Sequence, residues 1–87
     1  MAAKEVVLTN EAGLHARPAT MLVSEVSKYN CDIKLIKDGR EYNPRSIMSV
    51  LSMGAVKDDN LLIRVIGTDE ENVLEAIVDF IENKIID

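Results

Sequence analysis

The stretch DIKLIKDGREYN, residues 32–43, carries the clearest fold signal in this sequence. Apolar and polar residues alternate up to Lys37, as they do in a strand with one buried face. Asp38 and Gly39 form a dipeptide typical of a two-residue hairpin turn, and REYN supplies the return strand. We therefore predict an antiparallel hairpin over residues 32–43.

A strand and a helix precede this hairpin. Residues 4–9, KEVVLT, are short and rich in β-branched side chains, which is typical of a strand. From Ala16 to near Asn30, apolar residues recur at helical spacing with polar residues between them. The apolar positions are Ala19, Leu22, Val23 and Val26. This spacing predicts an amphipathic helix.

A short helix and a buried strand follow the hairpin. Pro44 ends the return strand, Ser46 is a suitable N-cap, and Gly54 suits the left-handed residue after a helix. Between them, IMSVLSM (47–53) is mostly apolar and predicts a helix. NLLIRVIG, residues 60–67, predicts the last and most buried strand.

The chain then predicts a long C-terminal helix, because Thr68 and Glu71 form a capping box before apolar residues at helical spacing. The element order is β-α-β-β-α-β-α, an α+β pattern that implies an antiparallel or mixed sheet with helices on one face. The pattern favours a ferredoxin-like arrangement or a near relative. Strand order cannot be read from periodicity.

Composition narrows the function. A chain of 87 residues suits a single domain over residues 1–87, without a second domain for a multi-substrate enzyme. A net charge of -5 and only two tyrosines and one phenylalanine disfavour nucleic-acid binding. No apolar run approaches the roughly 20 residues that cross a membrane, so we expect a cytoplasmic protein without membrane insertion. The lone Cys31 can form neither an internal disulfide nor a zinc site, and we expect no metal and no cofactor.

The helix that begins at Ala16 lacks a usual N-cap. Gly13 and Leu14 offer no side-chain acceptor, and His15 is an unusual cap. The first N–H groups of a helix have no internal partner and carry partial positive charge, so they attract an anion. Arg17 adds a planar fork of donors that suits phosphate oxygens. We infer an anion site at this helix start.

The strength of such a site indicates how it would hold its anion. A helix start contributes about 0.3–1 kcal/mol and a charged hydrogen bond about 1.5–3 kcal/mol. A dissociation constant of about 1 mM already requires ~4 kcal/mol of binding free energy, so these contacts would hold free phosphate with millimolar affinity or weaker. The site better suits a phosphoryl group bonded to His15, because a neutral imidazole can attack phosphorus. The alternative is a surface histidine beside a solvated arginine, and the residues alone do not decide between the two.

The predicted helix over 47–53 carries too wide an apolar arc for one buried face. Ile47, Met48 and Leu51 share one sector, while Val50 and Met53 lie in another. We expect one sector to stay exposed as a docking patch. In the alternative interpretation all five residues serve the core.

Two motifs, GLHARPA (13–19) and RSIMSVLSMG (45–54), make the whole chain resemble HPr, the histidine-containing phosphocarrier family of the bacterial phosphoenolpyruvate-dependent sugar phosphotransferase system. The resemblance implies an open-faced β-sandwich with four antiparallel strands in the order 1-4-2-3 and three helices on one face. It implies that phosphoenolpyruvate-charged enzyme I passes its phosphoryl group to Nδ1 of His15, and that enzyme IIA domains take it for sugar uptake. The chain would then be a monomeric carrier and a substrate of transferases, not an enzyme.

The resemblance also assigns residue roles. Arg17 would interact with the phosphoryl group, and the backbone N–H groups of Ala16 and Arg17 would face its oxygens. The implied docking residues are Thr20, Ile47, Met48 and Leu51. They would meet enzyme I, the enzyme IIA domains and regulators.

Ser46 alone is most simply an N-cap. In HPr proteins of the low-GC Gram-positive type, the matching serine is phosphorylated by HPr kinase/phosphorylase, which implies binding to a transcriptional co-regulator of the catabolite control protein A type. The chain departs from that type at Ser49, where glycine is frequent, and at Ser24 and Ser27, which leave the first helix less basic.

Two other functions stay open at this point. One is an HPr-like paralogue of the nitrogen-related branch or of a dihydroxyacetone-kinase phosphorelay, with the same His15 chemistry but other partners. The other is a ferredoxin-like module that binds RNA or a metabolite, against which the few aromatic residues and the negative charge both count.

Overall fold

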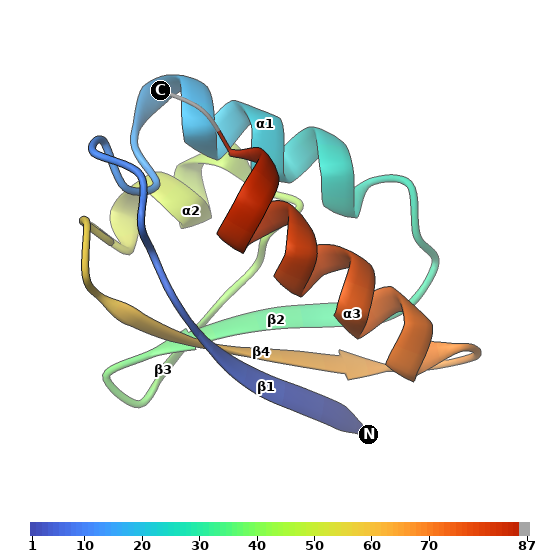
Figure 1. Ribbon diagram of the computed structural model, residues 1–87. Coiled ribbons are helices and arrows are strands. Elements are labelled where there is room, and N and C mark those ends of the chain that lie inside the picture. Colours follow the sequence, from blue (N-terminus) through green and yellow to red (C-terminus); the bar gives the residue numbers. More distant parts are fainter. Residues whose placement is uncertain (86–87) are drawn as a thin grey trace.

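The computed structural model describes residues 1–85 and has the predicted order of strands and helices (Figure 1). The strands are β1 (Ala2–Val7), β2 (Asp32–Lys37), β3 (Arg40–Tyr42) and β4 (Asn60–Ile66). The helices are α1 (Ala16–Val26), α2 (Ile47–Ser52) and α3 (Glu70–Asp79), which continues as a π-helical turn over Phe80–Lys84. The hairpin predicted at 32–43 is confirmed, with its two strands joined by the turn at Asp38 and Gly39.

The four strands form one antiparallel sheet in the order β1-β4-β2-β3. Ile63 of β4 lies opposite Lys4 of β1 on one side and opposite Leu35 of β2 on the other. This is the order that the family resemblance implies. It separates the sheet from a ferredoxin-like one, in which the first strand is interior, whereas β1 here lies at an edge.

All three helices cover the same face of the sheet (Figure 1). Alternate residues of β4, namely Leu61, Ile63 and Val65, are fully buried beneath them. Leu22 of α1 and Ile77 of α3 are equally buried on the helix side. One core therefore lies between the sheet and the helical layer. Within residues 1–85, no helix is long and apolar enough to span a membrane.

Two elements, β1 and α1, have bounds that differ from the sequence prediction by more than one residue. β1 begins and ends two residues earlier than the predicted 4–9, although Leu8 still exchanges backbone hydrogen bonds with residues 58 and 59. The regular part of α1 ends at Val26, and single turns continue to Tyr29, whose N–H donates to the Val26 carbonyl at 3.2 Å. Both differences are of the size expected for element ends.

The predicted capping box of Thr68 and Glu71 is wrong. Asp69 occupies the N-cap position of α3 with a left-handed φ of 62° and makes no side-chain cap bond. The carboxylate of Glu70 instead accepts a 3.1 Å hydrogen bond from the N–H of Gly67. The left-handed turn therefore moves the N-cap one residue past Thr68, to Asp69, and a different acid, Glu70, holds the turn.

Candidate functional site

His15 stands at the N-terminus of α1 with its side chain exposed. Its backbone is extended, with φ -116° and ψ 154°, and its side chain makes no cap hydrogen bond. The predicted absence of an ordinary N-cap is therefore confirmed. Within residues 1–85, no group of three or more His, Cys, Asp or Glu side chains is placed to hold a metal ion.

The residue after His15 is conformationally strained. Ala16 has φ 41°, in the left-handed region that a side chain normally avoids, at a cost of about 1–3 kcal/mol. The Thr20 hydroxyl donates to the Ala16 carbonyl at 3.2 Å. Arg17 is exposed beside it, and Pro18 is buried in the first turn. The exposed imidazole and guanidinium thus flank a strained peptide at an open helix start.

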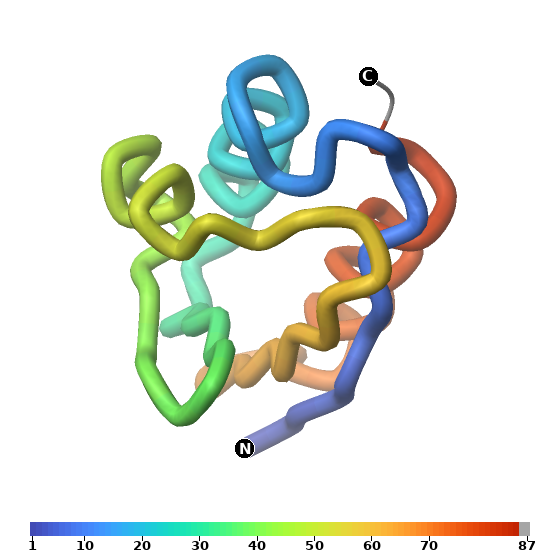
Figure 2. The backbone as a smooth tube through the Cα atoms, turned by 90° about the vertical axis from the view of Figure 1, so that its left-hand side faces the viewer, coloured from blue at the N-terminus to red at the C-terminus, as the bar shows by residue number. Residues whose placement is uncertain are grey.

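The loop before His15 rests on the loop that follows α2. Figure 2 shows the two loops passing beside each other, and the Leu14 N–H donates to the Ala55 carbonyl at 3.0 Å. Gly13 has φ 59°, and a Cβ there would lie 2.5 Å from the Ala55 oxygen and 2.6 Å from Cα of Val56. Glycine at position 13 therefore meets two needs, a left-handed turn and a close approach of two backbones.

His15 also borders a hollow of about 320 Å³ on this side of the molecule. The other lining residues are Ala12, Leu14, Leu51, Gly54, Ala55 and Val56. Leu51 belongs to the second sequence motif, so the fold brings the two motifs to one surface. Val56, which is 57% exposed, is a lining residue that the sequence prediction missed. The only sequence signal for Val56 is its apolar side chain in the short loop between α2 and β4.

The exposures along α2 separate its two sectors as predicted. Val50 is fully buried and Met53 is 5% exposed, whereas Met48 is 72% exposed. Ile47 and Leu51 are half-buried and pack against the edge of the core. The alternative in which all five residues serve the core is therefore wrong. The sector of Ile47, Met48 and Leu51 thus keeps one exposed apolar side chain, Met48, and Leu51 of the same sector lines the hollow that His15 borders.

Ser46 is the N-cap of α2, as predicted. Its Oγ accepts a hydrogen bond from the Ser49 N–H at 3.2 Å, and its own N–H donates to the Asn43 carbonyl. The Ser49 hydroxyl accepts from the Asn43 N–H at 2.9 Å, a contact that the sequence did not reveal. The Arg45 guanidinium donates to the Tyr29 carbonyl at the far end of α1. Ser46 is thus half-buried in a bonded turn and does not border the His15 hollow.

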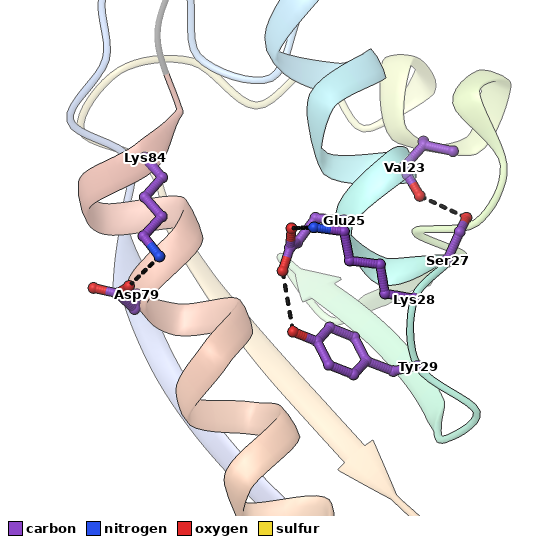
Figure 3. Close-up of polar contacts among 7 residues, drawn as sticks. All are labelled: Val23, Glu25, Ser27, Lys28, Tyr29, Asp79 and Lys84. Carbon is purple, nitrogen blue, oxygen red and sulfur yellow. Dashed lines mark hydrogen bonds and ion pairs between the residues drawn. The ribbon is translucent and has the colours of Figure 1, made fainter.

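Side-chain hydrogen bonds gather at the C-terminal end of α1 (Figure 3). Glu25 accepts from Lys28 Nζ at 2.9 Å and from the Tyr29 hydroxyl at 3.1 Å. The hydrogen bond from Lys28 to Glu25 raises the pKa of Lys28. Burial raises the pKa of Tyr29, and the hydrogen bond from its hydroxyl to Glu25 adds to this rise. The Ser27 hydroxyl donates to the Val23 carbonyl at 2.7 Å. Local contacts therefore hold the side chains of Glu25, Ser27, Lys28 and Tyr29 at this end.

The fold and the site together define a small α+β protein that presents one histidine at an uncapped helix N-terminus. The sequence profile of a family described as "PTS HPr component phosphorylation site" matches residues 2–83. The chain belongs to this family, the HPr phosphocarriers of the phosphotransferase system.

Solved structures agree with this assignment. A protein described as HPr-C-His from Thermoanaerobacter tengcongensis is 36% identical, with a TM-score of 0.92 over 98% of this chain and 96% of that one. The phosphocarrier protein HPr of Bacillus anthracis str. Ames is 34% identical, with a TM-score of 0.87 over 92% and 95%. The Bacillus subtilis catabolite repression protein Crh, described as a dimer with a swapping domain, is 29% identical, with a TM-score of 0.76 over 100% of each chain.

Proposed function

We propose that this chain accepts a phosphoryl group from phosphoenolpyruvate-charged enzyme I on His15 and passes it to enzyme IIA domains for sugar uptake. One observation carries the proposal: in a chain of the HPr family, the exposed imidazole of His15 stands at the uncapped N-terminus of α1. The chain acts as a substrate of two transferases. It works as a monomer in the cytoplasm and uses no cofactor of its own.

The transfer step uses the Nδ1 lone pair of His15. A bond forms between Nδ1 and phosphorus, while the bond between phosphorus and its donor on enzyme I breaks and leaves its electron pair on the donor. Arg17 and the backbone N–H groups of Ala16 and Arg17 then face the phosphoryl oxygens. Such charge-assisted hydrogen bonds are stronger than neutral ones. In the second transfer the N–P bond breaks and His15 is regenerated.

The docking surface comprises Thr20, Ile47, Met48 and Leu51. Thr20 is exposed on the first turns of α1, and Met48 is the most exposed apolar residue of α2. Leu51 borders the same hollow as His15. A partner that covers this surface would therefore bring its own reacting group next to the imidazole.

Ser46 is the proposed regulatory site, phosphorylated by HPr kinase/phosphorylase. A phosphate there adds about -1.5 to -2 charges next to Ile47 and Met48. We expect weaker acceptance of phosphate from enzyme I and stronger binding to a co-regulator of the catabolite control protein A type. The likeness to Crh, whose description names catabolite repression, supports this second role.

The central test incubates the protein with phosphoenolpyruvate and enzyme I and measures its intact mass. We expect one phosphoryl group that is acid-labile and alkali-stable, and no gain in His15→Ala. Equal gain in His15→Ala, or none in the wild type, would refute the carrier function. Phosphorylation only by the enzyme I of a nitrogen-related branch would assign the chain to a regulatory paralogue.

A separate test addresses Ser46. The protein is incubated with ATP and HPr kinase, with Ser46→Ala as the comparison. We expect one acid-stable phosphoryl group in the wild type and none in the variant. If the wild-type protein stays unmodified, the proposed regulatory role of Ser46 is refuted, while the proposed chemistry of His15 is unaffected.

A further inference from the structure

The loop that carries His15 is held at both ends by one short segment, residues 55–59. Before the loop, the Leu8 N–H donates to the Asp59 carbonyl at 3.0 Å, and the Asp58 N–H donates to the Leu8 carbonyl at 2.8 Å. After the loop, the Leu14 N–H donates to the Ala55 carbonyl at 3.0 Å. The spacing between these two attachments therefore sets where the chain enters His15.

The carboxylate of Asp59 closes the turn that separates the two attachments. Its Oδ2 accepts from the Val56 N–H at 2.9 Å, and the Asp59 N–H donates back to the Val56 carbonyl at 3.1 Å. Lys37 Nζ lies 3.9 Å from the same Oδ2. The Asp59 side chain thus links Val56, the neighbour of Ala55, to Asp59 itself, whose carbonyl accepts from Leu8.

We propose that Asp59 is a positioning residue for His15. It does not border the His15 hollow, and it acts by holding residues 55–59 in the one shape that fits Leu8 and Leu14 together. The hydrogen bond to Val56 carries this effect, rather than the charge next to Lys37. The expected effect on the transfer rate rests on the proposed function, whereas the expected effect on the shape of the loop does not.

Hydrogen exchange tests the structural part directly. In Asp59→Ala, we expect the Leu8 and Leu14 amides to exchange at least tenfold faster relative to the Ile63 amide in the central strand β4, which reports global opening. Asp59→Asn should restore slow exchange, because its side-chain oxygen can still accept from Val56. Asp32→Ala is the matched control, since this exposed aspartate lies at the opposite end of the sheet.

Transfer kinetics test the functional part. With phosphoenolpyruvate and enzyme I, we expect Asp59→Ala to lower kcat for His15 phosphorylation several-fold with little change in KM, because the docking residues keep their places. Asp59→Asn and Asp32→Ala should match the wild type. Unchanged Leu14 exchange in Asp59→Ala, or an Asp59→Asn as impaired as Asp59→Ala, would overturn the inference. If the wild type gains no phosphate, the carrier function fails, while the exchange data still decide the role of Asp59.

Discussion

Gly13 and Val56 approach so closely that a Cβ on Gly13 would lie 2.6 Å from Cα of Val56. Gly13 also has φ 59°, so Gly13→Ala meets both backbone strain and a backbone clash. We expect it to lower the free energy of unfolding by about 2–4 kcal/mol. Gly39→Ala is the control, because Gly39 has a similar φ of 79° but no atom within 4 Å of the added Cβ. Equal losses in urea unfolding would show that the loop contact adds nothing.

Arg17 is expected to act on the phosphoryl group and not on the fold. Its side chain is exposed, so Arg17→Ala should leave the unfolding transition within about 0.5 kcal/mol of the wild type. A lost charged hydrogen bond of about 1.5–3 kcal/mol corresponds to roughly 10- to 150-fold slower transfer from enzyme I. Arg17→Lys should recover part of the rate, because it keeps the charge without the planar fork. A transfer rate in Arg17→Ala equal to that of the wild type would show that Arg17 does not act on the phosphoryl group.

Met48 is expected to serve docking alone. Because it is 72% exposed, Met48→Ala should leave stability nearly unchanged while raising the KM for enzyme I several-fold at constant kcat. Ile66→Ala is the control, since Ile66 is a 43% exposed apolar residue on the sheet face away from the helices. The same rise in KM for both variants would mean that the patch has no special part in docking.

Ser46 caps α2 and is also the proposed regulatory site, and two substitutions separate these two roles. Ser46→Ala removes the acceptor for the Ser49 N–H and should cost about 1 kcal/mol. Ser46→Asp keeps a good N-cap and should preserve stability while slowing His15 phosphorylation, because it adds charge next to the docking surface. Ser52→Ala removes an exposed hydroxyl at the other end of α2 that donates to the Ser49 carbonyl at 2.7 Å, and it should change stability by less than about 0.5 kcal/mol and leave the transfer rate unchanged. An Asp variant with a wild-type transfer rate would contradict the proposed charge effect.

Asp79 contributes to the pH dependence of stability. Its carboxylate accepts from Asn83 at 2.8 Å and lies 3.3 Å from Lys84 Nζ (Figure 3 shows the second contact). The Asn83 bond first, and Lys84 second, hold the pKa of Asp79 below its ordinary value. The stabilisation is therefore complete above the unfolded-state pKa and is lost as the pH falls through the lower folded-state pKa.

Carbon-detected NMR titration of the Asp79 carboxyl group measures this pKa directly. Asn83→Ala should raise it toward the ordinary value, and Asp79→Asn should flatten the acid limb of the stability curve. Asp32→Asn is the matched control, because Asp32 is an exposed aspartate in β2 and not in α3. A pKa that does not move in Asn83→Ala would assign the shift to Lys84 instead.

Local signals predicted the elements well. The Asp38-Gly39 turn, the Ser46 cap and the uncapped start at Ala16 each depend on a few neighbouring residues, so the sequence contains them in full. The capping box at Thr68 failed because it competes with a left-handed turn at Asp69 and with the Gly67–Glu70 bond. Both candidate caps suit the local sequence, and spacing alone does not rank them.

The sequence by itself determined that His15 precedes a helix without an ordinary N-cap, and that the apolar residues of α2 are more than one buried face can hold. Only the tertiary structure decided the neighbours of that helix start: Val56 against Gly13, Ala55 beneath Leu14, and Asp59 closing the turn between them. The physical reason is that helix and turn signals arise from interactions a few residues apart. Contacts between distant loops instead depend on the order in which the strands pair, which periodicity does not encode.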